Sequence, residues 1–147
     1  MNPPKHKIYI INIKAVFMGK TLIIGQSGGP TSVINASLVG AVKEALKHQE
    51  IDRILGTYYG IDGILNSNYY EFSKDDDFLA LETTPAAVLG SIRFKLSNDF
   101  NDPVYEQILY KFIENNVGYF FYIGGNDSMD TCNKLAQYFI NKKAQIL

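Results

Sequence analysis

Along most of the chain, short apolar runs alternate with segments in which apolar residues recur at helical spacing. The apolar runs predict strands over residues 21–24, 53–58 and 119–123. The helical spacing predicts helices over residues 32–48 and 128–141, and Pro103 opens another. Because alternating strands and helices are typical of βαβ units, the pattern predicts an α/β fold. We expect one mostly parallel sheet with helices on both of its faces.

The other segments carry weaker patterns. Residues 59–77 mix Gly, Asn, Ser and Tyr without a clean period, which predicts loops with small strands at most. Residues 145–147 resemble the start of a strand, so we expect a chain truncated within an element. Residues 1–17 place basic positions before an interrupted apolar stretch, and Met18 follows. We interpret residues 1–17 as an N-terminal extension rather than a secretory signal, and residues 18–147 as the domain.

Composition narrows the classes of function. Of the 147 residues, 46% are hydrophobic, which is enough for the core of one ordinary domain. Lys and Arg number 14 against 15 Asp and Glu, so the net charge of -1 gives no basic surface for nucleic acid or an anionic membrane. The single cysteine, Cys132, cannot form an internal disulfide, and its helical spacing favours the core over a nucleophilic role. We therefore expect small-molecule or protein partners and a cytoplasmic location.

Two Gly-rich segments lie after predicted strands, where open α/β sheets bind ligands. In residues 25–32, glycines allow a phosphate to approach the backbone at the start of a helix. Residues 124–131 join two glycines to the carboxylates of Asp127 and Asp130. Carboxylates beside an anion site suggest Mg²⁺, which proteins hold through one or two such groups.

A third segment, residues 89–96, places Arg93 after a Gly-Ser turn, where a planar guanidinium suits phosphate oxygens. Each segment also has a plain structural explanation. The first is a tight turn with Thr31 or Ser32 capping the helix, and Asn, Asp or Ser caps the helix after the second. An arginine after a turn is ordinarily a solvated surface residue.

Taken in this order and spacing, the three segments resemble the phosphofructokinase family. The matching motifs are Ser-Gly-Gly at residues 27–29, Asn-Ala at 35–36, Gly-Ser-x-Arg at 90–93 and Ile-Gly-Gly-Asn-Asp-Ser at 123–128. The resemblance runs from about Met18 to the end of the chain and implies the Rossmann-like N-terminal domain of that family. It also implies phosphorylation of fructose 6-phosphate at its 1-position by ATP or pyrophosphate with Mg²⁺, in a homo-oligomeric parent enzyme.

The resemblance implies roles for particular residues. Donor binding would involve Gly28, Gly29, Arg93, Gly125, Asn126, Asp127 and Ser128, with Arg93 and Asp127 catalytic and Asn126 at the metal. In the family, the aspartate base and most sugar-binding residues lie one strand beyond the Gly-Gly loop. Because the 147 residues end before that segment, we expect this chain alone to be inactive in phosphoryl transfer.

Departures from the family pattern bear on the donor. ATP-using members resemble Gly-Gly-Asp-Gly-Ser, whereas Asp127 takes the place of the glycine before the serine. Its bulk and charge would obstruct the α-phosphate of a nucleotide, which favours pyrophosphate. Asn126 replaces the usual metal aspartate and is a poorer partner for Mg²⁺. Val39 and Lys43 replace arginines of the nucleotide effector site in allosteric bacterial members, so we expect no effector control of that type.

Two alternatives stay open. NAD kinases and lipid kinases also carry a Gly-Gly-Asp-Gly loop after a strand, so an ATP-dependent kinase of that type is one. A catalytically inactive fragment, or an anion-binding remnant, is the other. The Ser-Gly-Gly and Gly-Ser-x-Arg motifs favour a phosphofructokinase, and Asp127 favours pyrophosphate as its donor. The resemblance therefore implies the N-terminal part of a pyrophosphate-dependent 6-phosphofructokinase, an enzyme of glycolysis.

Overall fold

The computed structural model describes residues 19–143, whose strands form one sheet in the order β3-β2-β1-β4. The strands are β1 (Lys20–Gln26), β2 (Ile51–Thr57), β3 (Tyr69–Phe72) and β4 (Val117–Ile123). β1 pairs in parallel with β2 and β4, and β3 joins the edge of β2 in antiparallel fashion. The predicted mostly parallel sheet is confirmed. The predictions for residues 1–17 and 145–147 lie outside the described residues.

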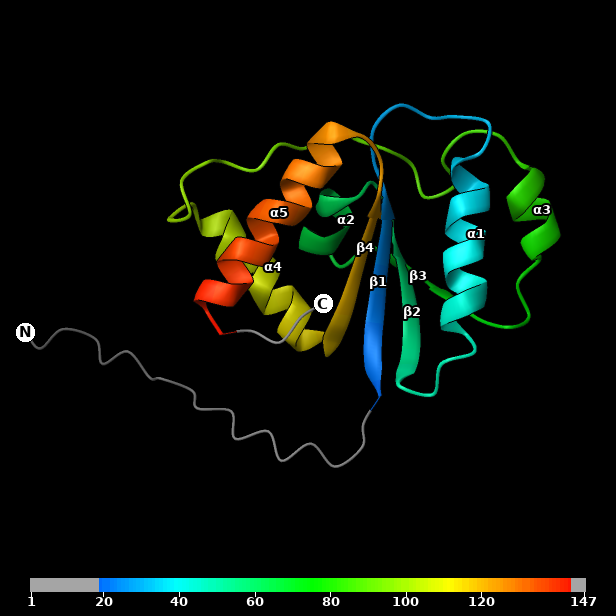
Figure 1. Ribbon diagram of the computed structural model, residues 1–147, viewed down its shortest axis with the longest axis horizontal. Helices are drawn as coiled ribbons and strands as arrows, with labels where there is room; N and C mark the ends of the chain where they lie inside the picture. The colour runs from blue at the N-terminus through cyan, green and yellow to red at the C-terminus, as the bar shows by residue number, and fades with distance from the viewer. Residues whose placement is uncertain (1–18, 144–147) are drawn as a thin grey trace, which may run out of the picture.

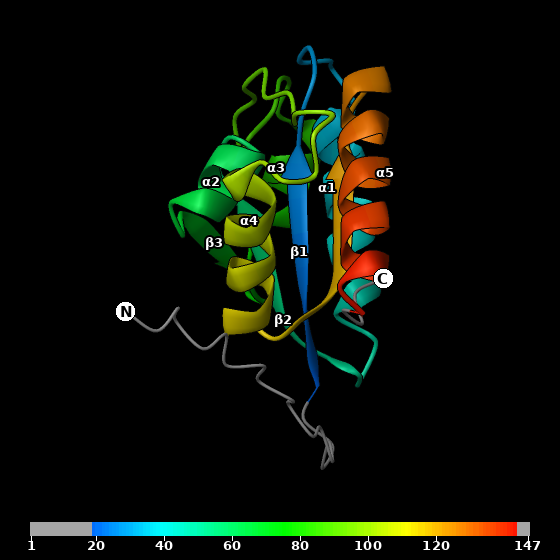
Figure 2. The same cartoon turned by 90° about the vertical axis from the view of Figure 1, so that its left-hand side faces the viewer.

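Helices cover both faces of this sheet, as the sequence predicts. They are α1 (Ile34–Ala45), α2 (Ile61–Leu65), α3 (Phe78–Thr83), α4 (Pro103–Glu114) and α5 (Asn126–Asn141). Figure 1 shows α1 and α3 on one face and α2, α4 and α5 on the other, and Figure 2 shows α2, α4 and α5 in front of the sheet. Among residues 19–143, no helix has both the length and the apolar character needed to cross a membrane.

Alternate residues of the central strand feed two separate apolar layers, because successive strand side chains point to opposite faces. Leu22 and Ile24 of β1 pack in the layer beneath α1. Ile23, between them, packs in the layer beneath α2, α4 and α5. All three are completely buried, so β1 is the central strand of the fold as well as its first.

Aromatic rings fill the layer beneath α4 and α5. The ring of Phe112 lies 5.4 Å from that of Phe120 on β4 and 5.2 Å from that of Phe139 on α5. Phe112 thereby joins helix to strand and helix to helix, and its side chain is fully buried. The pairs have the edge and tilted arrangements that aromatic quadrupoles favour.

The structure differs from the sequence predictions in its short elements. Residues 59–77 contain both α2 and β3, but α2 has five residues, too few to display a period. The predicted cap of α1 is wrong: the helix begins after Val33 with no side-chain cap, and the Thr31 hydroxyl accepts from the Val33 N–H in the preceding turn. α5 begins at Asn126, two residues earlier than predicted.

The aromatic packing yields a stability prediction. Phe112→Ala should lower the free energy of unfolding by about 3–5 kcal/mol, because the cavity would adjoin both β4 and α5. Tyr110→Ala, on the exposed side of the same helix, should change it by less than about 0.5 kcal/mol. Urea unfolding followed by circular dichroism measures both. Equal losses in the two variants would contradict the role assigned to Phe112.

Candidate functional site

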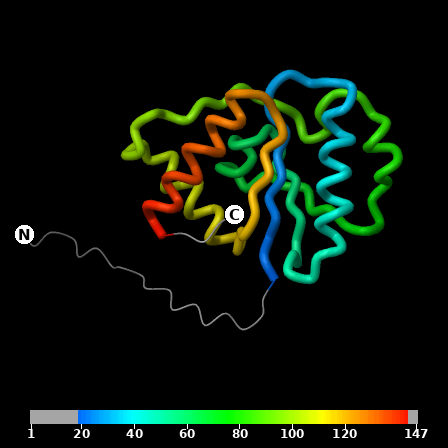
Figure 3. The backbone as a smooth tube through the Cα atoms, in the orientation of Figure 1, coloured from blue at the N-terminus to red at the C-terminus, as the bar shows by residue number. Residues whose placement is uncertain are grey.

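The two Gly-rich loops leave the sheet side by side. Gln26 ends β1 opposite Ile123 at the end of β4, and these strands are parallel neighbours. The Ser27 N–H donates to the Ile123 carbonyl at 2.8 Å, and a Cβ atom added at Gly28 would lie 3.5 Å from the Gly125 nitrogen. The predicted placement of both loops at one edge of the sheet is therefore confirmed (Figure 3).

The Gly-Ser-x-Arg segment joins the same edge. The Ser91 hydroxyl donates a hydrogen bond to the Gly28 carbonyl, 63 residues earlier in the chain. Leu89 and Leu96 are buried on either side, whereas Arg93 between them is exposed. Within residues 19–143, Arg93 makes no hydrogen bond or ion pair. Arg93 thus follows, by two residues, the position where this segment meets the first loop, and the fold uses none of its donors within residues 19–143.

The N-terminus of α5 is free of side-chain capping. Its N-cap is Gly125, and the polar residues that follow do not cap it, so capping does not explain their presence. The backbone N–H groups of Asn126 and Asp127 find no acceptor among the described residues. Free amides and the helix dipole together favour an anion at this position.

Ser128, at the third position of α5, supplies another unused polar group. Its residue is 2% exposed, and its Oγ is buried without a hydrogen-bond partner in the described part of the chain. The hydroxyl lies against Gly124, where an added Cβ would come within 2.1 Å of it. A buried hydroxyl without a partner is costly, so Ser128 is poised to donate to a ligand or a bound water.

The glycines of the two loops fall into two kinds. Gly124 is needed by the fold because a Cβ there would clash with Ser128, and Gly28 has a φ of +81°. Gly29 and Gly125 have neither constraint: an added Cβ would meet no atom within 4 Å. Open space beside a backbone that any residue could adopt is what a closely approaching ligand requires.

The predicted pair of carboxylates is reduced to one. Asp130 is paired with Lys134 at 2.7 Å, and the buried Lys134 ammonium also donates to the Leu96 carbonyl at 3.1 Å. Asp130 therefore helps to anchor α5 to the segment that carries Arg93. Among residues 19–143, no group of three His, Cys, Asp or Glu side chains is arranged to hold a metal ion. The exposed oxygens of Asn126 and Asp127 remain, and they fit Mg²⁺, which takes one or two protein oxygens and completes its shell with phosphate and water.

Two buried amide side chains support the site, and the sequence analysis assigned them no role. Gln26 Nε2 donates to Asn35 Oδ1 at 2.9 Å, and both residues are fully buried. The Leu89 N–H donates to Gln26 Oε1 at 3.0 Å, and the Val88 N–H donates to Asn35 Oδ1 at 3.0 Å. Asn35 Nδ2 donates to the Thr84 carbonyl at 2.9 Å. The pair thus fastens the segment before Arg93 to β1 and α1.

Tyr122 is a further supporting residue without a sequence signal. It lies in β4, and its hydroxyl would be 2.3 Å from a Cβ added at Gly60, whose φ is +62°. Burial raises the pKa of the Tyr122 phenol, so it stays protonated. Glycine at position 60 lets the turn between β2 and α2 close over this ring.

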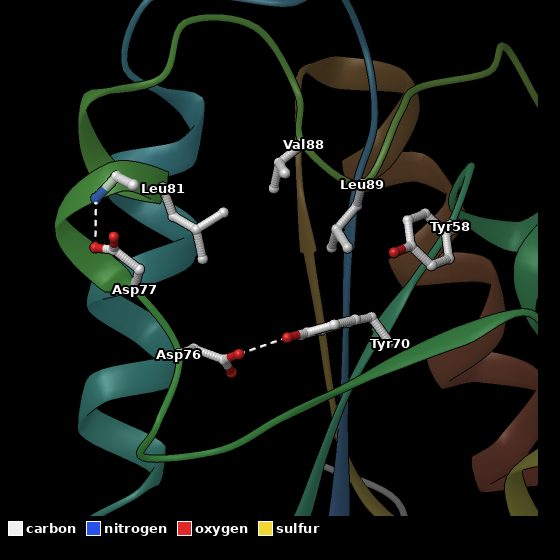
Figure 4. Close-up of a pocket in the computed structure, with 8 residues that line it drawn as sticks. Tyr58, Tyr70, Asp76, Asp77, Leu81, Val88 and Leu89 are labelled. Carbon is white, nitrogen blue, oxygen red and sulfur yellow. Dashed lines mark hydrogen bonds between the residues drawn. The ribbon is translucent and has the colours of Figure 1, made fainter.

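A cavity of about 330 Å³ lies on the α3 side of the same support. Figure 4 shows Val88 and Leu89 on one wall, with the Tyr70 hydroxyl donating to Asp76. None of the predicted donor-binding residues lines it. The cavity therefore adjoins the third segment at Leu89 but includes none of the residues assigned to the donor.

The geometry can be set beside known proteins. A model of the phosphofructokinase family matches residues 21–146. The pyrophosphate–fructose 6-phosphate 1-phosphotransferase of Rhodospirillum rubrum is 39% identical over 119 residues, covering 79% of this chain and 28% of that protein. The enzyme of the same name from Methylococcus capsulatus is 41% identical over 119 residues, with 76% and 28% covered.

Solved structures give the same fold. The pyrophosphate-dependent phosphofructokinase of Nitrosospira multiformis superposes with a TM-score of 0.79 at 38% identity, covering 86% of this chain and 32% of that one. The chain therefore spans about 28% of the length of the relatives named above. The rest of each relative is not aligned with these residues.

The prediction that Cys132 is a packing residue can be tested by its chemistry. Cys132 is half-buried in α5, and burial raises the pKa of its thiol. The thiolate is the reactive form, so a raised pKa leaves less of it at mildly alkaline pH. A disulfide reagent should label the folded chain more slowly than the same chain unfolded in guanidinium. Labelling at equal rates would contradict a packing role.

Proposed function

Because the chain belongs to the phosphofructokinase family, we propose that it forms the donor-binding part of a 6-phosphofructokinase. The reaction is transfer of a phosphoryl group from pyrophosphate, in preference to ATP, to fructose 6-phosphate. The product is fructose 1,6-bisphosphate, an intermediate of glycolysis. Residues 18–147 form this part of the enzyme, and residues 1–17 precede it as an extension.

The observation that carries the proposal is the open space beside Gly29 and Gly125 on adjoining loops. The fold requires glycine at neither position, and, unlike Gly40 in α1, both lie on loops beside the start of a helix, where a ligand can approach the backbone. The N–H groups of Asn126 and Asp127, which have no acceptor among the described residues, lie at the start of α5 beside Gly125 and suit a phosphate. Pyrophosphate is small enough to lie between the two adjoining loops and accept hydrogen bonds from these amides.

Arg93 is the cation of the site. Its guanidinium is exposed and unpaired within residues 19–143, so it can form two parallel hydrogen bonds to phosphate oxygens. Phosphoryl transfer relies on positioning and on stabilising spread negative charge, and Arg93 supplies the second. The Gly28 carbonyl accepts a hydrogen bond from the Ser91 hydroxyl, and this bond fixes the start of the first Gly-rich loop beside the proposed donor site.

Asn126 and Asp127 would hold Mg²⁺ through their side-chain oxygens. When bound, the ion neutralises part of the charge on the phosphates. Asp127 also restricts the donor, because a carboxylate at the start of α5 repels the additional phosphate of a nucleotide. Asn126 contributes an oxygen without a second charge, which leaves the helix N-terminus able to attract the donor.

The acceptor and the setting follow from the family. The Rhodospirillum rubrum and Methylococcus capsulatus relatives are named for both pyrophosphate and fructose 6-phosphate, which supports these substrates. We place the parent enzyme in the cytoplasm, where sugar phosphates of glycolysis are found, as a homo-oligomer. The sugar pocket and the base belong to segments beyond the Gly-Gly loop in the family pattern.

The first test fills the open space. Gly125→Ala and Gly29→Ala should leave the fold intact but weaken pyrophosphate binding about tenfold or more, ~1.4 kcal/mol, since a methyl group would take the ligand's place. Calorimetric titration of the 147-residue chain with pyrophosphate and Mg²⁺ measures this. Gly40→Ala is the matched control: its Cβ also meets no atom within 4 Å, but it lies in α1. Unchanged affinity in both loop variants would refute the proposed site.

The second test concerns donor choice. Asp127→Gly should raise the affinity for ATP relative to pyrophosphate about tenfold, because bulk and charge leave the nucleotide's path together. Asp127→Asn removes the charge and keeps the size, so it separates the two causes. Competition between ATP and pyrophosphate for the chain gives the ratio. A ratio that stays constant in both variants would show that Asp127 does not select the donor.

A further inference from the structure

Two hydrogen bonds connect residues 26–28 to residues 89–91 in the same order along both segments. The Leu89 N–H donates to Gln26 Oε1, and two residues later the Ser91 hydroxyl donates to the Gly28 carbonyl. The first bond is inaccessible to solvent, since Gln26 is fully buried and Leu89 is 2% exposed. Arg93 follows the second bond by two residues.

We propose that Gln26 and Asn35 are positioning residues for Arg93. They act through the backbone of residues 84–91, which they hold against the donor loop, and neither touches the donor itself. The proposal rests on the proposed function, because it concerns how Arg93 is presented to pyrophosphate.

The segment is held by separate hydrogen bonds on either side of Arg93, and downstream the Lys134 ammonium donates to the Leu96 carbonyl. Residues 84–102 contain neither helix nor strand, so no regular backbone ladder fixes their course. Asn35 binds this segment at Thr84 and Val88, and Gln26 binds it at Leu89. Because Arg93 has no partner of its own among residues 19–143, its position depends on the bonds that hold the backbone on both sides of it, and Gln26 and Asn35 supply the upstream ones.

Amide side chains are suited to this task. Gln26 must accept from the Leu89 N–H and donate to Asn35 at once, and Asn35 must accept twice and donate once. A carboxylate cannot donate, and an apolar side chain can do neither. Either replacement leaves buried backbone groups unpartnered, which favours movement of the segment toward water.

A double-mutant cycle tests the positioning role. Arg93→Ala should weaken pyrophosphate binding by the unsubstituted chain about tenfold. In Gln26→Met, which keeps the length of the side chain but neither hydrogen bond, the chain should already bind weakly. Arg93→Ala should then cost less than about twofold more, because a misplaced arginine has little to lose. The titrations use temperatures at which circular dichroism shows every variant folded.

Ser91→Ala offers a second route should Gln26→Met fail to fold. It removes only the bond to Gly28, at a partly exposed position, and should show the same non-additivity with Arg93→Ala. Ile108→Val is the control for lost stability, because Ile108 is fully buried in α4 and contacts neither loop; there Arg93→Ala should keep its full effect.

The outcomes separate the two proposals. An equal factor for Arg93→Ala in all backgrounds would overturn the positioning role and leave the proposed function standing. Absence of pyrophosphate binding by the unsubstituted chain, or no effect of Arg93→Ala in it, would overturn the proposed function and the positioning role together. The positioning role is supported if Arg93→Ala loses its effect in the Gln26 and Ser91 variants but keeps it in Ile108→Val.

Discussion

The polar atoms of Gln26 and Asn35 are enclosed where water does not reach, and each of them has to find a partner inside the protein. Their partners are one another and the backbone of residues 84–89. This requirement decides where an otherwise irregular segment crosses the end of the sheet. The apolar layers also hold this segment, through Leu89 on one face and Leu96 on the other, and the amides add its polar connections to β1 and α1. Two amides thus help to set the position of the Arg93 segment relative to the two Gly-rich loops.

Glycine serves two purposes in this fold, and only one of them concerns folding. Gly28 and Gly60 have positive φ angles, and Gly124 leaves room for the Ser128 hydroxyl, so chain geometry accounts for all three. Gly29 and Gly125 answer to no neighbour within the described residues. Gly40 in α1 has the same open space, so the space counts only together with the position of Gly29 and Gly125 on loops that adjoin each other at the ends of β1 and β4.

Long periodic elements could be predicted from the sequence, whereas short elements and polar connections could not. The apolar spacing after Pro103 predicted α4, and the apolar run before Gly124 predicted β4, because both patterns extend over several residues. The helix α2 has five residues, too short to show its period, and the capping residues before α1 serve the preceding turn instead. The order of strands and motifs predicted that the Gly-rich segments lie at the carboxyl ends of the strands. It did not reveal that Asp130 pairs with Lys134, because a salt bridge on one helix looks the same in sequence as two free charges.

Parallel pairing of β1 with β2 and β4 has a practical consequence for handling the molecule. The Gly-rich loops after β1 and β4 leave from one end of these strands, whereas Lys20 starts β1 at the other end. The seven residues of β1 separate the two ends by about 23 Å at the usual rise of a strand. A tether attached ahead of Lys20 would therefore anchor the molecule to a sensor surface with the two Gly-rich loops directed toward solution.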